Sequence, residues 1–571
     1  MNARMLTTAV AAALLAGCNF APHYREPAAA PPAAFKEATP NDGAGTEGWK
    51  LAQPSDQLAR GDWWDIYDDP DLSALEGRVA KANQNVVQAE ATYREAWAVY
   101  REAVAQLFPT VGVNPEVVRS RSPSALAETG GGATAGEANS TGSAGTGTTG
   151  TGGTGGGTGA AAVAGPGTHT LFELPFEASY EVDLWGQVRN TIRENRALAQ
   201  SSAATLANEI LSMQAQLAQD YFNLRAVDEE RFILDTTMED YRASLRLTQT
   251  LYRTGIDSAE DVSQATTQLE TAEVQATDLG IARAQYEHAI AVLIGVPPAQ
   301  FSLAVKRFKP TIPAVPVAVP SVLLERRPDV AAAERQVAAA NAAIGVARAA
   351  YFPQLTLSAS AGFESLGASQ LLDWSNRFWS VGAGAAQTLF DGGARFAATD
   401  RAKAAYDQTV AQYRQTVLAA FQAVEDNLVS LRVLSREVMQ QHRAAASAET
   451  TVRLSLTRYQ QGVDSYVNVI SAQNTFLSSR EAELQTQLRQ ILASIGLVQN
   501  LGGGWTRDAI GGDERLARHA DRGVVPQPDQ APSGTVARVA NPPPLPVSEK
   551  TPEDMLKEDN SVMAPPPPPP E

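Results

Sequence analysis

Apolar residues recur every three or four positions over several long stretches of this chain, with polar residues between them. One such stripe runs from Leu72 to Leu107 and indicates about five heptads of coiled-coil helix. A shift of 244 residues places a second stripe from Leu323 to Tyr351, and the same shift superposes Phe108-Pro109 on Phe352-Pro353. The sequence therefore predicts an internal duplication of a helical unit.

After each Phe-Pro pair the apolar period changes to two, which is typical of strands with one apolar and one polar face. Strands of about ten residues with this alternation suit a transmembrane barrel, and two hairpins of a soluble sandwich are the alternative interpretation. One chain supplies four strands, too few to close a barrel, so closure requires two or three chains. The alternating segments are Val111 to Val117, Phe172 to Val182, Leu355 to Phe363, and roughly Trp379 to Phe390.

Two further helical patterns are much longer. They run from about Leu184 to Arg253 and from about Ala394 to Arg458, and neither contains a Pro. At 1.5 Å per residue, each gives a helix of about 100 Å. A second helical pattern follows each of them and ends with Gly295 or Gly502. The sequence thus predicts two long helical hairpins.

Each hairpin turns at a short stretch that occurs twice, now with an offset of 207 residues. Gly255 and Gly462 can take the left-handed conformation that ends a helix. Asp257 and Asp464, or the Ser after each, can cap the next helix, and Glu260 completes a capping box in the first copy. The two stretches are Tyr252-Arg-Thr-Gly-Ile-Asp-Ser258 and Tyr459-Gln-Gln-Gly-Val-Asp-Ser465.

The N-terminal residues have the pattern of a secretory signal, with Arg4 followed by an apolar run that is too short to span a bilayer. Leu15-Ala16-Gly17-Cys18 resembles the bacterial lipobox, which implies a covalent lipid on Cys18, the single Cys of the chain. Asn19 after it favours the outer membrane by the same resemblance. The alternative is an ordinary signal peptide with a chance Cys.

Composition divides the rest of the chain. Residues 122–167 are nearly all Gly, Thr, Ala and Ser, so we expect a disordered insertion in one strand hairpin. The predicted parts are a signal peptide (1–17), a lipid-anchored tether (18–61), a first repeat (62–300), a Pro-rich connector (301–320), a second repeat (321–510) and a disordered acidic, Pro-rich tail (511–571).

The formal net charge of −17 and the absence of a basic stretch argue against a nucleic-acid partner. A single Cys excludes an internal disulfide or a Cys-based zinc site, and the five His have no metal-ligand spacing. No combination of nucleophile, His and acid indicates a hydrolase. We therefore expect no catalytic residues, no bound metal and no cofactor other than the lipid.

Several ordered motifs make the chain resemble the TolC-like outer membrane factors, especially the NodT/OprM-type lipoproteins of tripartite efflux pumps. The resemblance covers roughly residues 62–505 and implies a homotrimer, in which a twelve-stranded β-barrel is continued by a periplasmic α-helical barrel. It also implies a periplasmic adaptor and an inner-membrane RND-type pump as partners. The motifs are Ser179-Tyr-Glu-Val-Asp-Leu-Trp-Gly186, Leu293-Ile-Gly-Val-Pro-Pro298, Leu324-Glu-Arg-Arg-Pro-Asp-Val330, Ala350-Tyr-Phe-Pro-Gln-Leu355 and Leu389-Phe-Asp-Gly-Gly393.

The resemblance places an aperture at the helical tips, where the family carries acidic residues. Asp261 matches that pattern, whereas Asn468 and Ser471 stand where the family often has Asp. Helix capping is the alternative role of the two tip aspartates, and plain packing is that of the two tyrosines. Gly255 and Gly462 would contact the adaptor. The expected aperture residues are Tyr252, Asp257, Asp261, Tyr459 and Asp464.

Together these patterns predict passive conduction through a water-filled duct in the outer membrane. Acidic residues on the polar strand face, which are Glu173, Glu177, Glu181 and Asp183, would make the lumen anionic and favour cations. The exit duct of a type I protein-secretion system would use the same architecture. From a different class of protein, a lipid-anchored coiled-coil scaffold without a pore is the other alternative.

Overall fold

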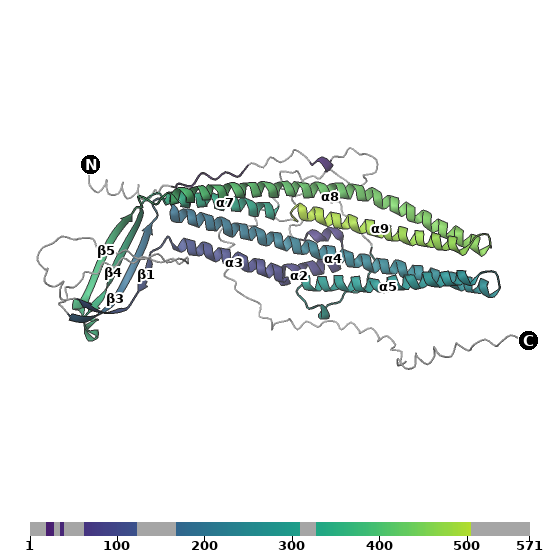
Figure 1. Cartoon of the computed structure of the whole chain (residues 1–571), viewed down its shortest axis with the longest axis horizontal. Helices are drawn as coiled ribbons and strands as arrows, with labels where there is room; N and C mark the ends of the chain where they lie inside the picture. The colour runs from purple at the N-terminus through teal and green to yellow at the C-terminus, as the bar shows by residue number, and fades with distance from the viewer. Residues whose placement is uncertain (1–18, 28–34, 39–61, 123–166, 309–326, 504–571) are drawn as a thin grey trace, which may run out of the picture. The chain divides into compact units, whose positions relative to one another are not determined.

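The computed structural model of this chain describes residues 19–27, 35–38, 62–122, 167–308 and 327–503 (Figure 1). The expected signal peptide, Cys18, most of the Gly/Thr-rich tract, most of the Pro-rich connector and the acidic tail lie outside the described residues. All described residues belong to one compact unit.

Helices make up most of the described chain, and six of the seven described α-helices form three pairs of equal length. Short α3 and α7 have 22 residues each, long α4 and α8 have 67, and α5 and α9 have 35. A 67-residue helix is about 100 Å long. The bounds are α2 (Pro70–Ala82), α3 (Gln84–Ala105), α4 (Gln187–Arg253), α5 (Ala259–Leu293), α7 (Pro328–Ala349), α8 (Ala394–Gln460) and α9 (Tyr466–Asn500), with short 3-10 turns η1 (Lys36–Ala38), η2 (Trp63–Tyr67), η4 (Pro298–Gln300), η5 (Ala368–Gln370) and η6 (Trp374–Asn376).

The predicted duplication is confirmed by these elements. The start of α7 follows that of α3 by 244 residues, and α8 and α9 follow α4 and α5 by 207. The α4–α5 and α8–α9 hairpins lie side by side, with both turns at the end away from the strands (Figure 1). The two repeats are therefore joined lengthwise, and α4 also contacts α9.

The even spacing of the first apolar stripe suggested one continuous helix, but the structure contains two. The stripe breaks at Asn83, whose extended backbone separates α2 from α3. The Asn83 side chain accepts hydrogen bonds from the N–H groups of Asn85 (2.9 Å) and Val86 (3.2 Å) and donates one to the carbonyl of Leu293 (2.9 Å). Capping and this tertiary bond offset the lost helical bonds, and an apolar period alone does not report either of them.

Antiparallel strands form one sheet in which β1 and β2 both pair with β3, β3 pairs with β4, and β4 with β5. The pairing of β1 and β2 with β3 keeps one register, since Val113 faces Phe176 and Glu116 faces Glu173. Pro115 and Pro175 lie in or opposite the gap and donate no backbone hydrogen bond, which explains the interruption. The strands are β1 (Thr110–Val113), β2 (Glu116–Ser122), β3 (Gly167–Val182), β4 (Gln354–Ser365) and β5 (Arg377–Ala386).

Four strand positions were predicted, and four are present when β1 and β2 count as one. Two limits differ from the prediction. Ser122 and Gly167 pair with each other in the sheet and do not belong to the disordered tract. The last strand ends at Ala386 instead of Phe390, because alternation in the sequence continues for a few residues after the pairing with β4 has stopped.

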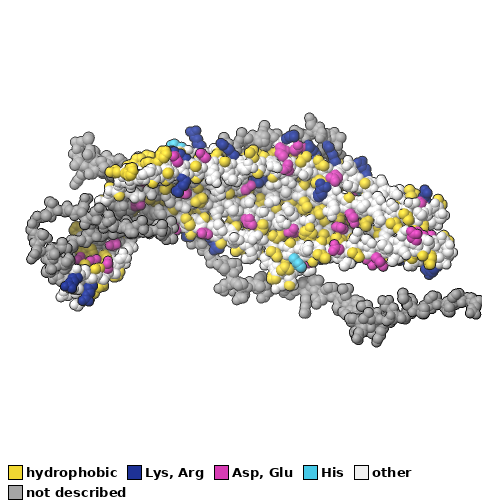
Figure 2. Space-filling view, viewed as in Figure 1, with side chains coloured by type: hydrophobic (Ala, Val, Ile, Leu, Met, Phe, Trp, Pro, Cys, Tyr) yellow, Lys and Arg dark blue, Asp and Glu magenta, His cyan; other side chains and the backbone are white. Residues whose placement is uncertain are grey.

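The helical part has its main core where α4 meets α2, α9 and η2. Tyr221, Leu217 and Leu224 of α4 are completely buried there, and Ile491 and Ile495 of α9 complete the layer. Along the rest of the helices small residues dominate, and in one face of the molecule acidic and basic side chains are scattered over the helices (Figure 2). None of the helices in the described ranges is both long and apolar enough to cross a membrane.

Candidate functional site

Both helical tips end their first helix in the same way. Gly255 and Gly462 have φ values of +77° and +70°, and their N–H groups donate to the carbonyls of Tyr252 and Tyr459 (2.9 Å each). With a second bond one residue later, this is the Schellman ending, which requires a left-handed residue that Gly adopts without strain. The second bonds run from Ile256 to Leu251 (2.9 Å) and from Val463 to Arg458 (3.0 Å).

The second helix of the first tip begins at Ser258. Its hydroxyl accepts a hydrogen bond from the N–H of Asp261 (3.2 Å), and the Asp261 carboxylate accepts one from the N–H of Ser258 (3.2 Å). This is a capping box. The predicted partner, Glu260, is wrong, because Ser258 and not Asp257 is the cap, so that the third helical residue is Asp261.

The second tip begins its helix without a side-chain cap at Ser465. Asp464 accepts a hydrogen bond from the N–H of Ser465 (3.0 Å) and forms an ion pair with Arg458 (3.3 Å). A hydrogen bond from Asn468, helped by these contacts, holds the pKa of Asp464 below its usual range. Asp464 therefore ties the end of α8 to the start of α9 within one tip.

Among the expected aperture residues, Tyr459 joins one tip to the other. The hydroxyl of Tyr459, at the end of α8, donates to the Asp257 carboxylate of the first tip and lies 3.2 Å from the hydroxyl of Thr248 on α4. The Tyr459 side chain is buried and packs on Tyr466, with 5.2 Å between the ring centroids. Burial, and then the neighbouring Asp257 carboxylate, raise the pKa of Tyr459, so the hydroxyl keeps its proton.

The reciprocal contact is not made. Tyr252 occupies the position of Tyr459 in the first repeat, but it is 49% exposed, and its hydroxyl has no partner among the described residues. Asp464, which occupies the position of Asp257, is engaged by Arg458 instead. The four aperture residues of the two matching stretches thus form one contact between the tips, and Asp261 completes a cap.

The acidic strand residues lie on the sheet as their spacing indicated. Glu173, Glu177 and Glu181 share the polar face of β3, because they are separated by even numbers of residues. Glu173 lies directly between Glu116 of β2 and Glu364 of β4. Across three strands, three carboxylates therefore stand in one row.

Asp183 differs from these glutamates because it lies after the last residue of β3. Its carboxylate accepts hydrogen bonds from the N–H groups of Val188 (3.3 Å) and Arg189 (2.9 Å) and pairs with the Arg189 side chain (2.9 Å). These contacts fix the first turn of α4. The carboxylate of Asp183 is thus neutralised by a neighbouring arginine.

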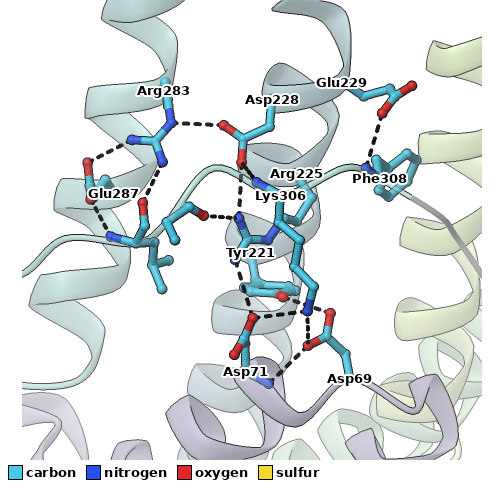
Figure 3. Close-up of polar contacts among 12 residues, drawn as sticks. Asp69, Asp71, Tyr221, Arg225, Asp228, Glu229, Arg283, Glu287, Lys306 and Phe308 are labelled. Atoms are coloured by element: carbon cyan, nitrogen blue, oxygen red, sulfur yellow. Dashed lines mark hydrogen bonds and ion pairs between the residues drawn. The ribbon is translucent and has the colours of Figure 1, made fainter. Parts of the chain in front are cut away.

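A buried polar network holds the first residues of the connector, 301–308, against α4 and α5 (Figure 3). We call this network the connector clamp. Its centre is Asp228, which is 1% exposed and accepts hydrogen bonds from Arg225 (3.0 Å) and Arg283 (2.8 Å). The same two arginines donate to the backbone carbonyls of Ala304 (2.7 Å) and Leu303 (2.6 Å).

Further contacts extend the clamp along α4. Glu229 receives the side chain of Arg307 (2.7 Å) and the N–H of Phe308 (3.2 Å). Lys306 reaches Asp71 of α2 (3.0 Å). This network was not predicted, although the three basic residues Lys306, Arg307 and Lys309 in a largely apolar connector were a signal that could have indicated it.

Near the tips, a groove of about 670 Å³ lies between α5 and α9. Its lining combines amide side chains, among them Gln264, Gln268 and Asn474, with apolar residues such as Ile470 and Leu477. In the part of the chain that the structure describes, no three His, Cys, Asp or Glu side chains gather as metal ligands. The expected lipid site at Cys18 lies outside the described residues.

Comparison with known proteins links this geometry to a transport family. The model of the family described as "Outer membrane efflux protein" matches residues 75–296 and 319–503, which are most of the two repeats. A curated relative, the probable efflux pump outer membrane protein TtgC of Pseudomonas putida, is 29% identical over 509 residues, covering 88% of this chain and 96% of the relative.

Two other similar proteins extend this picture. The pyoverdine export outer membrane protein OpmQ of Pseudomonas aeruginosa is 30% identical over 454 residues, covering 79% of this chain and 88% of OpmQ. Among solved structures, the outer-membrane channel OprN has a TM-score of 0.71 at 25% identity, covering 86% of this chain and 100% of OprN. Matches of this length include both strand hairpins and both helical hairpins.

Proposed function

This chain belongs to the outer membrane efflux protein family, and from that premise we propose that it forms, as a homotrimer, the exit duct of a tripartite efflux pump. It is an outer membrane transport protein and not an enzyme. The observation that carries the proposal is the pair of matched hairpins, which brings two tips to one end of helices about 100 Å long and joins them through Tyr459 and Asp257.

The homotrimer is supported by the unpaired edges of the sheet. The path of paired strands ends at β1/β2 on one side and at β5 on the other, and open edges in lipid leave backbone groups without partners. Three copies would close twelve strands. Hydrophobic side chains also gather where the sheet meets the start of α8 (Figure 2). Leu389 and Phe390, which precede α8, are 90% and 89% exposed in the single chain and need cover.

In a trimer the tips of three protomers would meet and close the periplasmic end of the duct. The bond from Tyr459 to Asp257 would hold each protomer in the closed arrangement. We propose that the adaptor docks at the tips, at Gly255 and Gly462, and that the RND-type pump delivers the cargo. Relatives are named as efflux pump components, and one is named for pyoverdine export, which supports small molecules as cargo here.

The lumen of the barrel would be anionic. Glu173, Glu177 and Glu181 share the polar face of β3, and that face would line the water-filled interior. Fixed carboxylates in a pore favour cations. Asp183 contributes less to this field, because Arg189 neutralises it. The lipid on Cys18 would anchor the chain to the same membrane, a proposal that rests on the lipobox-like sequence alone.

Two alternatives remain distinct from this proposal. The exit duct of a type I secretion system would have the same architecture, and the genes beside this one would tell them apart, because they would encode a drug or metal pump in one case and a protein exporter in the other. A scaffold without a pore does not need strands with one polar and one apolar face. Heat-modifiable trimers in outer-membrane fractions would exclude the scaffold.

Planar bilayer recording tests the duct directly. The wild-type trimer is expected to pass little current, and the Asp257→Ala variant, which loses the bond between the tips, is expected to pass large cation-selective currents. Glu177→Gln in the opened variant should reduce the cation preference without closing the pore. Anion-selective currents, or no current from the opened variant, would contradict the proposed function.

A further inference from the structure

The second repeat keeps one arginine of the connector clamp but not the carboxylate at the clamp's centre. With the offset of 207 residues, Arg432 of α8 occupies the position of Arg225 of α4. Arg225 has its carboxylate one turn further along its own helix, at Asp228. The corresponding position in α8 is Ser435, which carries no charge. Arg432 therefore has no carboxylate at the matching place in its own helix.

The N-terminal segment supplies a carboxylate to Arg432. Glu37 forms an ion pair with Arg432 across 395 residues of sequence. Beside it, the carboxylate of Glu425 accepts hydrogen bonds from the N–H groups of Lys36 (2.8 Å) and Glu37 (3.0 Å), which have no partner within the first turn of η1. Phe35 is 2% exposed and packs against Phe421 of α8, with 6.4 Å between ring centroids. We call residues 35–38 the N-terminal brace.

The same N-terminal segment is also fixed near the sheet. Phe20 stacks on Phe352, the residue before the Pro that leads into β4, with 4.4 Å between ring centroids. The carbonyl of Pro22 accepts a hydrogen bond from Asn341 of α7 (2.9 Å), and Tyr24 donates to the buried Glu334 of α7. The N-terminal segment is thus held at two places. Residues 19–27 lie at the strand end of the molecule, and the N-terminal brace lies partway along α8.

The connector clamp holds α4 at Arg225, and the N-terminal brace holds α8 at the matching position, Arg432. The brace makes fewer buried polar contacts than the clamp. The first hairpin is held by several buried carboxylates of its own, whereas in the second repeat the positions of Asp228, Glu229 and Glu287 are Ser435, Arg436 and Ser494. The brace is thus attached chiefly by Glu37, Glu425 and Phe35. Its removal would break the ion pair and the two backbone hydrogen bonds that hold the N-terminal segment on α8.

We propose that the N-terminal brace restrains the second helical hairpin and so limits the opening of the tip that carries Tyr459. The inference rests on the proposed channel function, since it predicts a change in gating. Because residues 19–27 are held beside the strands, the brace links the membrane end of the chain to α8. Detachment of the brace allows α8 and α9 to move away from α4, and the contact between the tips then breaks more often.

The test uses full-length trimers with Glu37→Gln or Arg432→Gln. Amide hydrogen exchange followed by mass spectrometry reports brace attachment, because the N–H groups of Lys36 and Glu37 are bonded to Glu425. Bilayer recording reports open probability. Both variants are expected to speed exchange in residues 35–38 and to raise the open probability about threefold, the size of effect that one partly exposed ion pair supplies. Arg443→Gln, an exposed position on the same helix, is the matched control and should change neither reading.

A charge exchange, Glu37→Arg with Arg432→Glu, should restore both readings towards wild type and shows that loss of folding is not the cause. Faster exchange with unchanged open probability overturns the inference, and so does unchanged exchange in both single variants. The Asp257→Ala channel separates the two failures. If it opens while the brace variants do not, only the brace is wrong; if it never conducts, the proposed duct itself fails.

Discussion

The two helical hairpins have identical lengths and turns of the same backbone geometry, yet their side chains make different contacts. Gly255 and Gly462 end their helices with the same pair of hydrogen bonds. Beyond that backbone device, the first tip caps its second helix with Ser258 and Asp261, while the second tip has no such cap. Both repeats therefore retain the glycine that ends the first helix. Their side chains have diverged, so that Tyr459 contacts Asp257 while Tyr252 and Asp464 make no equivalent contact.

The first hairpin also differs from the second halfway along the helices, and this difference predicts a large loss of stability. Asp228→Ala leaves Arg225 buried without its nearest carboxylate and Arg283 without one of its two, which should cost about 3 kcal/mol of stability. Ser435→Ala, at the matching place in α8, should cost less than about 0.5 kcal/mol. Apparent melting midpoints of the purified trimers measure both. Equal losses would contradict the view that the first hairpin alone has a self-contained clamp.

A second prediction concerns Glu76 in α2, a fully buried carboxyl whose oxygens have no hydrogen-bond partner among the described residues. Burial raises its pKa to about 9 from an ordinary 4.5. Between these values the unfolded chain ionises while the folded chain stays neutral, so this group's contribution to stability falls as the pH rises, by about 1.4 kcal/mol for each unit in that window.

Glu76→Gln cannot ionise and should remove that part of the pH dependence. Melting midpoints at pH 5 and pH 8 provide the comparison, and the variant should gain relative to wild type at pH 8 and not at pH 5. Parallel pH profiles for wild type and Glu76→Gln would show that Glu76 is solvated or paired in the native trimer.

The smallest predicted difference lies at the tips themselves. Ser258→Ala removes a capping hydroxyl and should destabilise the first tip by about 1 kcal/mol. Ser465→Ala removes a hydroxyl that makes no capping bond and should cost only a few tenths. Hydrogen exchange of the first turns of α5 and α9 resolves effects of this size. Similar losses at both sites would mean that Ser465 caps α9 in the assembled trimer.

Much of this fold could be predicted from the sequence, because long helices and alternating strands have periods that depend on burial alone. The helix-ending role of the two tip glycines could also be predicted, since a repeated Gly between helical patterns has a specific backbone role. Contacts between distant segments were not predictable. The N-terminal brace, the clamp around Asp228 and the break at Asn83 each depend on a partner more than 70 residues away in sequence, and no local period records such a partner.

The candidate site shows the same limit at the level of single residues. Tyr252 and Tyr459 occupy matching positions, and the sequence offers no reason to treat them differently. In the structure Tyr459 is buried against Tyr466 and Thr248, whereas Tyr252 is half exposed. The difference arises because the neighbouring hairpin covers one tyrosine and not the other. Only the packing of the two repeats decides which of them can bond across the tips.

This difference makes a matched pair of variants the most direct test of the account. Tyr459→Phe removes the hydroxyl that bonds to Asp257, and Tyr252→Phe removes its counterpart, which has no partner in the described chain. Single-channel recordings in planar bilayers should show frequent, large openings for Tyr459→Phe and wild-type behaviour for Tyr252→Phe. Equal conductance of the two variants, or openings only in Tyr252→Phe, would contradict the claim that one bond between the tips keeps this channel closed.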